Sequence, residues 1–262
     1  MTRAFIASEY SALQEAISQL QKKYYEKIEA ENLLKGLENK LSKIEVPLIV
    51  LSKTEIPSEE YLTIIHNLVE LLLEHHPEIK TETDQVLKLL HTDLAERWIS
   101  EVLAFNSNYF TRFAEENQLA DWLPYFLAEQ AIRPYLRVLA EYYQELLNQA
   151  EITTLGCPCC GEPIRLGQLQ GDGQKELVCP RCHAHWPEKR LKCSHCGNED
   201  HQTLSYLTVE GNSTEQVHVC TKCNNYTKII DIRQMIDKPD PTLLDLKTVY
   251  LDYVAQEKGF IG

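Results

Sequence analysis

Apolar positions along the first 150 residues follow the periodicity of amphipathic helices. From Ser11 onward they recur at steps of three and four residues, and lysine, glutamate and glutamine fill the remaining positions. Such a pattern predicts helices that each bury one side. The first stripe runs toward Pro47 through Leu13, Ile17, Leu20, Tyr24, Ile28, Leu34, Leu37 and Leu41. The alternative is a dimeric coiled coil over residues 13–41, which would make the chain a homodimer.

Three more helical segments are predicted before residue 150. One starts at Ser58, its expected N-cap, and stops near Pro77. Another runs from about Thr83 to Ile99. The last extends over about 120–150 and contains Pro134, which is expected to kink or break it because proline lacks an N–H group. Together the segments predict an α-helical bundle.

The composition changes sharply at Gly156. All nine cysteines lie beyond this residue, and nine of the ten glycines lie at or beyond it. A change of this kind predicts a domain boundary. The expected fold is α+β and multidomain, with an α-helical domain over 1–152, two small rubredoxin-like or zinc-ribbon modules with four cysteines each over 153–191 and 192–236, and a C-terminal helical tail over 237–262.

Eight of the cysteines form four C-x-x-C units, in which a tight turn aims both sulfur atoms at one point. The units are Cys157/Cys160, Cys179/Cys182, Cys193/Cys196 and Cys220/Cys223. Two units make one tetrahedral four-cysteine site for zinc or iron, and the spacing pairs the first with the second and the third with the fourth. Within each pair a hairpin is expected, turning at Gly171-Asp172-Gly173 and at Gly211-Asn212. The sequence therefore predicts two metal ions, iron or zinc.

The remaining residues near these units are expected to stay outside the metal sites. Cys159 lies between two ligands and is interpreted as a non-ligand. Five histidines also lie nearby, and each has a complete cysteine pair beside it: His183, His185, His195, His201 and His218. Trp186 is expected to fill the interface between the modules and Arg190 to hydrogen-bond backbone carbonyls there.

Charge and hydropathy exclude several classes of protein. The formal net charge is −13, with 14 Lys and Arg against 25 Asp and Glu in residues 1–156, which disfavours nucleic-acid binding. The densest basic cluster, Lys189-Arg190-Leu-Lys192, is short. No apolar run is long enough to insert into a membrane, and residues 1–10 lack the apolar region of a secretory signal. A cytoplasmic location is therefore expected, where thiols stay reduced.

The cysteine-rich segment resembles the FdhE family, accessory proteins for formate dehydrogenase formation. The resemblance rests on Cys179-x2-Cys182-x3-Trp186-x3-Arg190-x2-Cys193-x2-Cys196, on Cys157-Pro-Cys-Cys160-Gly-Glu-Pro163, on Cys223-x2-Tyr226-x-Lys228 and on the ending from Leu251-Asp252 to Phe260. It implies a cytoplasmic, chaperone-like assembly factor with an iron-associated, rubredoxin-like C-terminal region. Its implied partner is the catalytic subunit of formate dehydrogenase, and the surface around Trp186 and Arg190 is the expected contact.

No catalytic constellation is visible in the sequence, so the protein is predicted not to be an enzyme. Four thiolates also close the coordination sphere of a metal. Two alternatives stay open at this point. Iron in a four-cysteine site would suit an electron-transfer or thiol-redox protein. A zinc-ribbon nucleic-acid-binding protein is the less favoured alternative because of the acidic balance.

Overall fold

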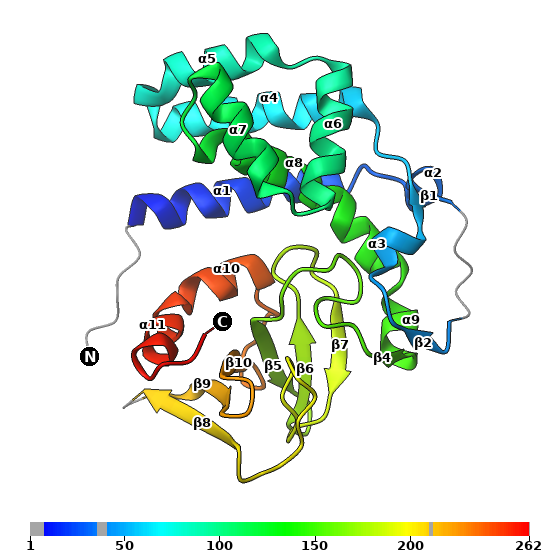
Figure 1. The fold of residues 1–262 in the computed structure, drawn as a ribbon, viewed down its shortest axis with the longest axis vertical. Helices are drawn as coiled ribbons and strands as arrows, with labels where there is room; N and C mark the ends of the chain where they lie inside the picture. Colours follow the sequence, from blue (N-terminus) through cyan, green and yellow to red (C-terminus); the bar gives the residue numbers. More distant parts are fainter. Residues whose placement is uncertain (1–7, 36–40, 210–211, 262) are drawn as a thin grey trace. The chain divides into compact units, whose positions relative to one another are not determined.

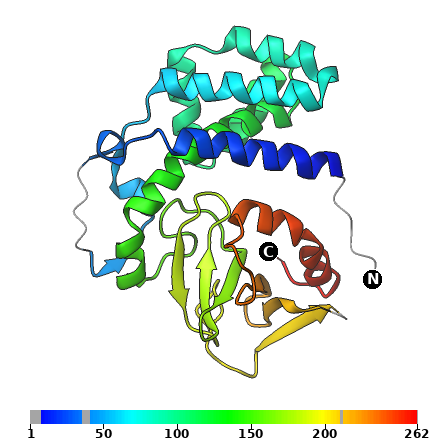
Figure 2. The same cartoon turned by 180° about the vertical axis from the view of Figure 1, so that it is seen from behind.

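The computed structural model describes residues 8–35, 41–209 and 212–261 (Figures 1 and 2). It divides into two compact units. Among the described residues, the helical unit comprises 8–35 and Lys53–Val138, and the sheet unit comprises 41–52, 139–209 and 212–261. Residues 41–52 therefore belong with the C-terminal part of the chain. The predicted boundaries at residues 152, 191 and 236 stay predictions.

The helical unit is built from amphipathic helices and a small β-pair. Its helices are α1 (Ser8–Tyr25), α2 (Ala30–Leu33), α4 (Ser58–His75), α5 (Lys80–Leu89), α6 (Thr92–Leu103), α7 (Ser107–Asn117) and, as far as Val138, α8 (Trp122–Tyr142), with a 3-10 turn at Pro77–Ile79. Helix α4 contacts both α1 and α6. Strands β1 (Leu34–Lys35) and β3 (Lys53–Thr54) pair antiparallel. Trp98, Tyr61 and Phe110 are fully buried in this unit, so the helices share one apolar core.

The first two helices depart from the predicted stripe. Helix α1 ends at Tyr25, and Leu34 enters strand β1, where pairing with Thr54 takes the backbone hydrogen bonds that a longer helix would have used. Leu37 lies outside the described residues. The prediction of an N-cap at Ser58 is also wrong, because Pro57 occupies the cap and Ser58 is already helical.

The segment predicted from Thr83 to Ile99 is two helices. Leu90 adopts an extended conformation between α5 and α6, and the Nδ1 atom of His91 accepts a hydrogen bond from the Leu94 N–H at 3.0 Å. The apolar spacing continues across Leu90, which is why the periodicity missed this break. A side-chain cap therefore restarts the chain as α6.

Pro134 lies inside α8 without breaking it, so of the expected kink or break the break is wrong, and the kink stays a prediction. Without an N–H group, Pro134 cannot donate to the carbonyl of Gln130 four residues earlier. The Nε2 atom of Gln21 on helix α1 donates to that carbonyl instead at 3.0 Å, and it lies 2.8 Å from the Gln130 Oε1. The Arg137 Nη2 donates in turn to the Gln21 Oε1 at 3.1 Å. A buried side chain from another helix thus satisfies the carbonyl that the proline leaves free.

The sheet unit contains one six-stranded sheet. Its strands are β5 (Leu166–Gln170), β6 (Gln174–Val178), β7 (His185–Glu188), β8 (Leu204–Val209), β9 (Asn212–Cys220) and β10 (Asn225–Asp231), in the order β7-β6-β5-β10-β9-β8. All neighbours are antiparallel except β5 and β10, which are parallel from Leu166 opposite Lys228 to Leu169 opposite Asp231. This parallel pair joins the two predicted modules into one sheet (Figure 1).

The two predicted hairpins form in this sheet. Gly171 and Gly173 adopt positive φ angles of 51° and 86° in the turn between β5 and β6. Gly211, in the second predicted turn, lies outside the described residues, although β8 and β9 pair as expected. The sequence does not predict strands β7 and β10, because each follows a cysteine knuckle closely and is short on alternating apolar positions.

Short elements at both ends of the sheet unit complete it. They are strands β2 (Lys43–Ile44) and β4 (Glu151–Ile152), which pair parallel, and helices α3 (Leu48–Leu51), α9 (Gln144–Gln149), α10 (Pro241–Lys247) and α11 (Val249–Glu257). Leu244, Tyr250 and Leu251 of the last two helices join one core cluster with sheet residues such as Leu166 and Ile230. The expected C-terminal helical tail therefore contains two helices, and they pack on the sheet.

The Gln21 contact gives a test of how Pro134 is accommodated. Gln21→Ala should lower the free energy of unfolding by about 1–3 kcal/mol, because it leaves the buried Gln130 carbonyl without a donor. In a Pro134→Ala background the loss should be smaller, since the substituted alanine supplies its own N–H. Urea denaturation of the four proteins measures this coupling.

Gln14→Ala serves as the matched control, because Gln14 is also buried on α1 but makes no hydrogen bond to α8 among the described residues. The changes in the free energy of unfolding caused by Gln14→Ala and by Pro134→Ala should be additive. Equal losses for Gln21→Ala in both backgrounds would contradict the explanation.

Candidate metal centre

The structure gathers the eight paired cysteines into two groups of four. Cys157, Cys160, Cys179 and Cys182 form the first cluster, and Cys193, Cys196, Cys220 and Cys223 form the second; in each, all sulfur atoms lie within 4.8 Å of one another. The groups are those that the sequence spacing predicts. All nine cysteines are free thiols rather than disulfides.

The sulfur positions suit a tetrahedral metal ion. Between knuckles, the Sγ–Sγ distances are 3.5 Å for Cys157–Cys182 and 3.6 Å for Cys160–Cys179. In the second cluster they are 3.6 Å for Cys193–Cys223 and 3.8 Å for Cys196–Cys220. A tetrahedron with metal–sulfur bonds of about 2.3 Å has edges of about 3.8 Å. Both clusters could therefore hold a zinc or iron ion with little movement.

A residue with positive φ follows the second cysteine of every knuckle. It is a glycine in two knuckles, at Gly161 with φ 82° and Gly197 with φ 69°, and it is His183 with φ 63° and Asn224 with φ 59° in the others. In three of the knuckles its N–H donates to the carbonyl of the first cysteine, as in Gly161 N–H to Cys157 O at 2.9 Å. This left-handed step closes the turn so that both sulfur atoms point the same way.

His183 occupies a position that favours glycine, and its side chain is fixed there. The His183 Nε2 lies 3.0 Å from the Thr242 Oγ1, and the Thr242 hydroxyl donates to the Pro180 carbonyl at 2.6 Å. Asn224 is anchored similarly, through a hydrogen bond from its Nδ2 to the Gly259 carbonyl at 2.7 Å. Both contacts tie a knuckle to the C-terminal segment.

The two clusters differ in burial. All four cysteines of the first cluster are buried, whereas Cys196 in the second is exposed and Cys223 is partly exposed. Burial raises the pKa of the Cys157, Cys160 and Cys182 thiols. Burial also disfavours the Cys179 thiolate, but hydrogen bonds from the other three thiols outweigh it and lower the pKa of Cys179. The first cluster is thus the more strongly shielded from solvent.

Backbone amides favour ionisation in the second cluster. Burial opposes the Cys220 thiolate, yet the N–H groups of Cys223 and Lys222 lower its pKa to about 7. The knuckle turn therefore presents donors to the sulfur atom, as metal-binding thiolates require.

Cys159 is buried but does not join either cluster. Its carbonyl accepts a hydrogen bond from the Ile49 N–H at 2.9 Å, and the Pro158 carbonyl accepts one from the Leu48 N–H at 2.8 Å. Helix α3 thus binds the backbone of the first knuckle. The interpretation of Cys159 as a non-ligand agrees with this placement.

The five neighbouring histidines lie outside both clusters as the structure describes them. His195 Nε2 is 2.7 Å from the Tyr226 carbonyl, and His185 Nδ1 is 2.8 Å from Glu176 Oε1. Burial lowers the pKa of His218 to about 4, with smaller contributions from Lys175 and Arg190. His201 is exposed. His185 and His195 thus contact oxygen atoms, His218 is partly buried and His201 faces solvent.

An ion network that the sequence reasoning missed anchors the C-terminal helices. Lys228, only 2% exposed, lies on β10, and its Nζ is 2.8 Å from carboxylate oxygens of both Asp245 and Asp252. The Tyr226 hydroxyl donates to Asp252 at 2.9 Å, and the Arg165 Nε donates to Asp245 at 2.8 Å. The available signal was a lysine between apolar residues in a strand, since such a lysine needs buried acidic partners.

Trp186 and Arg190 differ in their environments. Trp186 lies on β7 and is 3% exposed, so it fills the sheet unit and offers no exposed aromatic surface for a partner. The expectation of backbone hydrogen bonds from Arg190 is wrong. Within the described part of the chain, its exposed side chain makes no hydrogen bond or ion pair.

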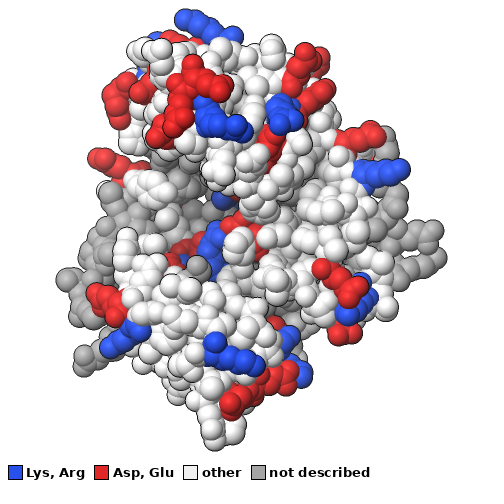
Figure 3. Space-filling view, in the orientation of Figure 1, with Lys and Arg blue, Asp and Glu red and all other residues white. Residues whose placement is uncertain are grey.

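Surface charge on the face drawn in Figure 3 and hydropathy of the described helices mark no nucleic-acid site or membrane span. Lys and Arg lie beside Asp and Glu over the face drawn in Figure 3, with no continuous basic field among its described residues. None of the described helices combines the length and apolar character needed to cross a membrane.

Comparison with known proteins shows which sequences this chain is similar to. Residues 191–261 match the family model of the FdhE C-terminal domain. The FdhE homologue of Aquifex aeolicus is 28% identical over 231 residues, covering 86% of this chain and 75% of the relative. That of Stutzerimonas stutzeri is 34% identical over 119 residues, 44% of this chain and 38% of the relative.

A solved structure shares the fold. The crystal structure of the FdhE protein from Pseudomonas aeruginosa superimposes with a TM-score of 0.60 and 18% identity, covering 94% of this chain and 83% of that one. The fold and the clusters define an α+β protein with tandem zinc-ribbon-like modules, each with four cysteines. Residues 191–261 match the FdhE C-terminal domain, and the resemblance of the chain to the FdhE family is confirmed.

The Lys228 network gives a stability test. Lys228→Met should lower the free energy of unfolding by about 3–5 kcal/mol, because Asp245 and Asp252 would lose a buried counter-charge. Lys222→Met removes an exposed lysine from the same region. This variant should change the free energy of unfolding by no more than about 0.5 kcal/mol. Urea denaturation with metal content held constant measures both; equal effects would contradict the role of the network.

Proposed function

We propose that this protein is an accessory factor for formate dehydrogenase that binds the catalytic subunit during its maturation. The observation that supports this function is the pair of four-cysteine clusters within a single sheet, in a segment that matches the FdhE C-terminal domain. The protein acts in the cytoplasm, before the enzyme is complete. It has no catalytic role of its own. It acts as a folded module that binds the catalytic subunit.

The eight paired cysteines are the proposed ligands of two metal ions. Four thiolates fill a tetrahedral coordination sphere, so zinc or iron would have no open position for a substrate. A small sheet with a limited apolar core gains stability when each ion links two knuckles. The metal therefore holds the client-binding region in shape.

A redox function is the second candidate, and the exposure of Cys196 is the observation that favours it. Iron in a four-cysteine site can exchange an electron, whereas zinc cannot, and an exposed ligand brings the second site near the surface. Protein purified anaerobically from iron-sufficient cells decides the matter. A coloured sample with iron absorption would support the redox function, and a colourless sample with stoichiometric zinc would contradict it.

Client binding is tested with the intact protein. Immobilised wild-type protein should capture the catalytic subunit of formate dehydrogenase, and Cys193→Ser combined with Cys196→Ser should abolish capture because the second cluster loses its metal. Cys159→Ser is the control, since this buried cysteine lies outside both clusters. Failure of the wild-type protein to capture the subunit would overturn the function. A double variant that both folds and binds would overturn the role of the second site.

The difference in burial predicts the order of metal loss. A chromogenic chelator should remove one metal equivalent in a fast phase and the other in a slow phase, with the fast phase arising from the site that contains Cys196. In Cys196→Ser the fast phase should disappear or accelerate further while the slow phase is unchanged. Cys160→Ser should alter the slow phase alone, and a fast phase that responds to Cys160→Ser would contradict the assignment.

A further inference from the structure

The four knuckles, numbered in chain order, fall into two classes by the residue that closes them. Gly161 and Gly197 close the first and third knuckles, whereas His183 and Asn224, with φ angles of 63° and 59°, close the second and fourth. A positive φ suits glycine, but it strains a residue that has a side chain, so such a residue persists only where its surroundings hold it. Each cluster contains one knuckle of each class. One knuckle in each cluster therefore needs a support that a glycine knuckle does not need.

Thr242, the second residue of helix α10, supports the second knuckle. Its hydroxyl donates to the Pro180 carbonyl at 2.6 Å, and the His183 Nε2 lies 3.0 Å from the same hydroxyl oxygen. Because the hydroxyl hydrogen points to Pro180, His183 is the donor in the second contact. Thr242 thus binds the knuckle on both sides of Cys182.

Residues 259–261 support the fourth knuckle. The Asn224 Nδ2 donates to the Gly259 carbonyl at 2.7 Å, and the Asn224 carbonyl accepts a hydrogen bond from the Ile261 N–H at 2.8 Å. Ile261 also forms a parallel β-bridge with Asn225. Among the described residues, Asn224 makes no hydrogen bond to the carbonyl of the first cysteine, as the closing residues of the other three knuckles do. The contacts with residues 259–261 therefore hold this turn in place.

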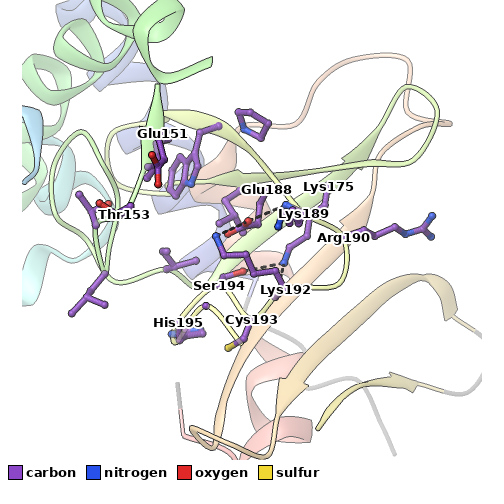
Figure 4. Close-up of a pocket in the computed structure, with 18 of the residues that line it drawn as sticks. Glu151, Thr153, Lys175, Glu188, Lys189, Arg190, Lys192, Cys193, Ser194 and His195 are labelled. Carbon is purple, nitrogen blue, oxygen red and sulfur yellow. Dashed lines mark hydrogen bonds and ion pairs between the residues drawn. The ribbon is translucent and has the colours of Figure 1, made fainter. Parts of the chain in front are cut away.

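Other elements hold the two glycine knuckles. Lys175 of β6 holds the third, because its Nζ donates to the Lys192 carbonyl at 3.1 Å and to the Ser194 hydroxyl at 3.0 Å (Figure 4). Helix α3 donates backbone hydrogen bonds to the first. In the part of the chain that the structure describes, no hydrogen bond joins either glycine knuckle to residues 240–261, the C-terminal segment. This segment thus binds the two knuckles that lack a closing glycine.

The C-terminal segment is fixed to the sheet independently of the knuckles. Lys228 of β10 binds one carboxylate on α10 and one on α11. Leu244 and Leu251, one from each helix, are buried in the core cluster that the sheet shares with these helices. Thr242 and residues 259–261 are therefore presented to the knuckles by a segment with anchors of its own.

We propose that the C-terminal segment positions one knuckle of each metal site and thereby sets how long both ions are retained. Thr242 is the positioning residue of the first site, and residues 259–261 position the second. Because folding of a knuckle and metal binding are coupled, a knuckle must open before its ion is released. Loss of one contact should therefore accelerate release from that site alone. The inference rests on the proposed metal ligands.

The first site is tested with full-length, zinc-loaded protein and a chromogenic chelator. Thr242→Val keeps the size of the side chain and removes the hydroxyl, so it should accelerate the slow phase of zinc release about tenfold. The fast phase should change less than about twofold, because it arises from the other site. In a His183→Gly background the same substitution should accelerate the slow phase less than about threefold, since glycine adopts this φ without support.

Thr248→Val is the matched control for this test. The Thr248 hydroxyl is also in the C-terminal segment, but it donates to the Leu244 carbonyl at 2.8 Å within the segment. Its loss should change both phases less than about twofold, because neither knuckle contact is removed.

The second site is tested by two substitutions at Asn224. Asn224→Ala keeps the strained φ and removes the side-chain anchor, so it should accelerate the fast phase about tenfold. Asn224→Gly also removes the anchor but relieves the strain, so it should change the fast phase less than about twofold. The slow phase should stay unchanged in both variants.

Three results would overturn the inference: no acceleration of the slow phase by Thr242→Val, equal acceleration by Thr242→Val and Thr248→Val, or equal acceleration by Asn224→Ala and Asn224→Gly. Each would leave the proposed metal sites standing if the wild-type protein still released two equivalents of zinc. Wild-type protein that holds no zinc would overturn the metal sites and the inference together.

Discussion

Mutual repulsion among four sulfur atoms is the constraint on which the sheet unit depends. Each cluster holds four cysteine side chains within 4.8 Å of one another, and in the first cluster all four are buried. Four thiolates this close repel one another strongly unless a cation lies between them, and burial strengthens that repulsion. On the proposed metal assignment, folding of the knuckles and binding of the metal are a single event.

Two further contacts connect the cysteine knuckles to the rest of the sheet unit. Parallel pairing of β5 with β10 makes one sheet out of two hairpins, each with its own cluster. Lys228 on β10 then binds Asp245 and Asp252 on the C-terminal helices. The residues through which the sequence resembles FdhE proteins include Tyr226, Lys228 and Asp252, and these three form one anchoring network.

The parts of the structure that depend on local chemistry could be predicted from the sequence. The spacing of the C-x-x-C units predicted which cysteines meet, because a knuckle is closed by its own turn and each pair is separated by one hairpin. Contacts between distant residues could not be predicted. Gln21 supplies the donor that Pro134 leaves missing, and Leu34 pairs with Thr54 in place of extending a helix. Arg190 was expected to bind carbonyls, but its neighbours are set by the tertiary fold.

The most direct test is X-ray absorption spectroscopy at the metal edge of the full-length protein, combined with metal analysis. The account predicts two ions for each chain, both with four sulfur neighbours at about 2.3 Å and no nitrogen or oxygen in the first shell. One ion for each chain, or a shell that contains nitrogen or oxygen, would contradict the assignment of eight cysteine ligands in two closed sites.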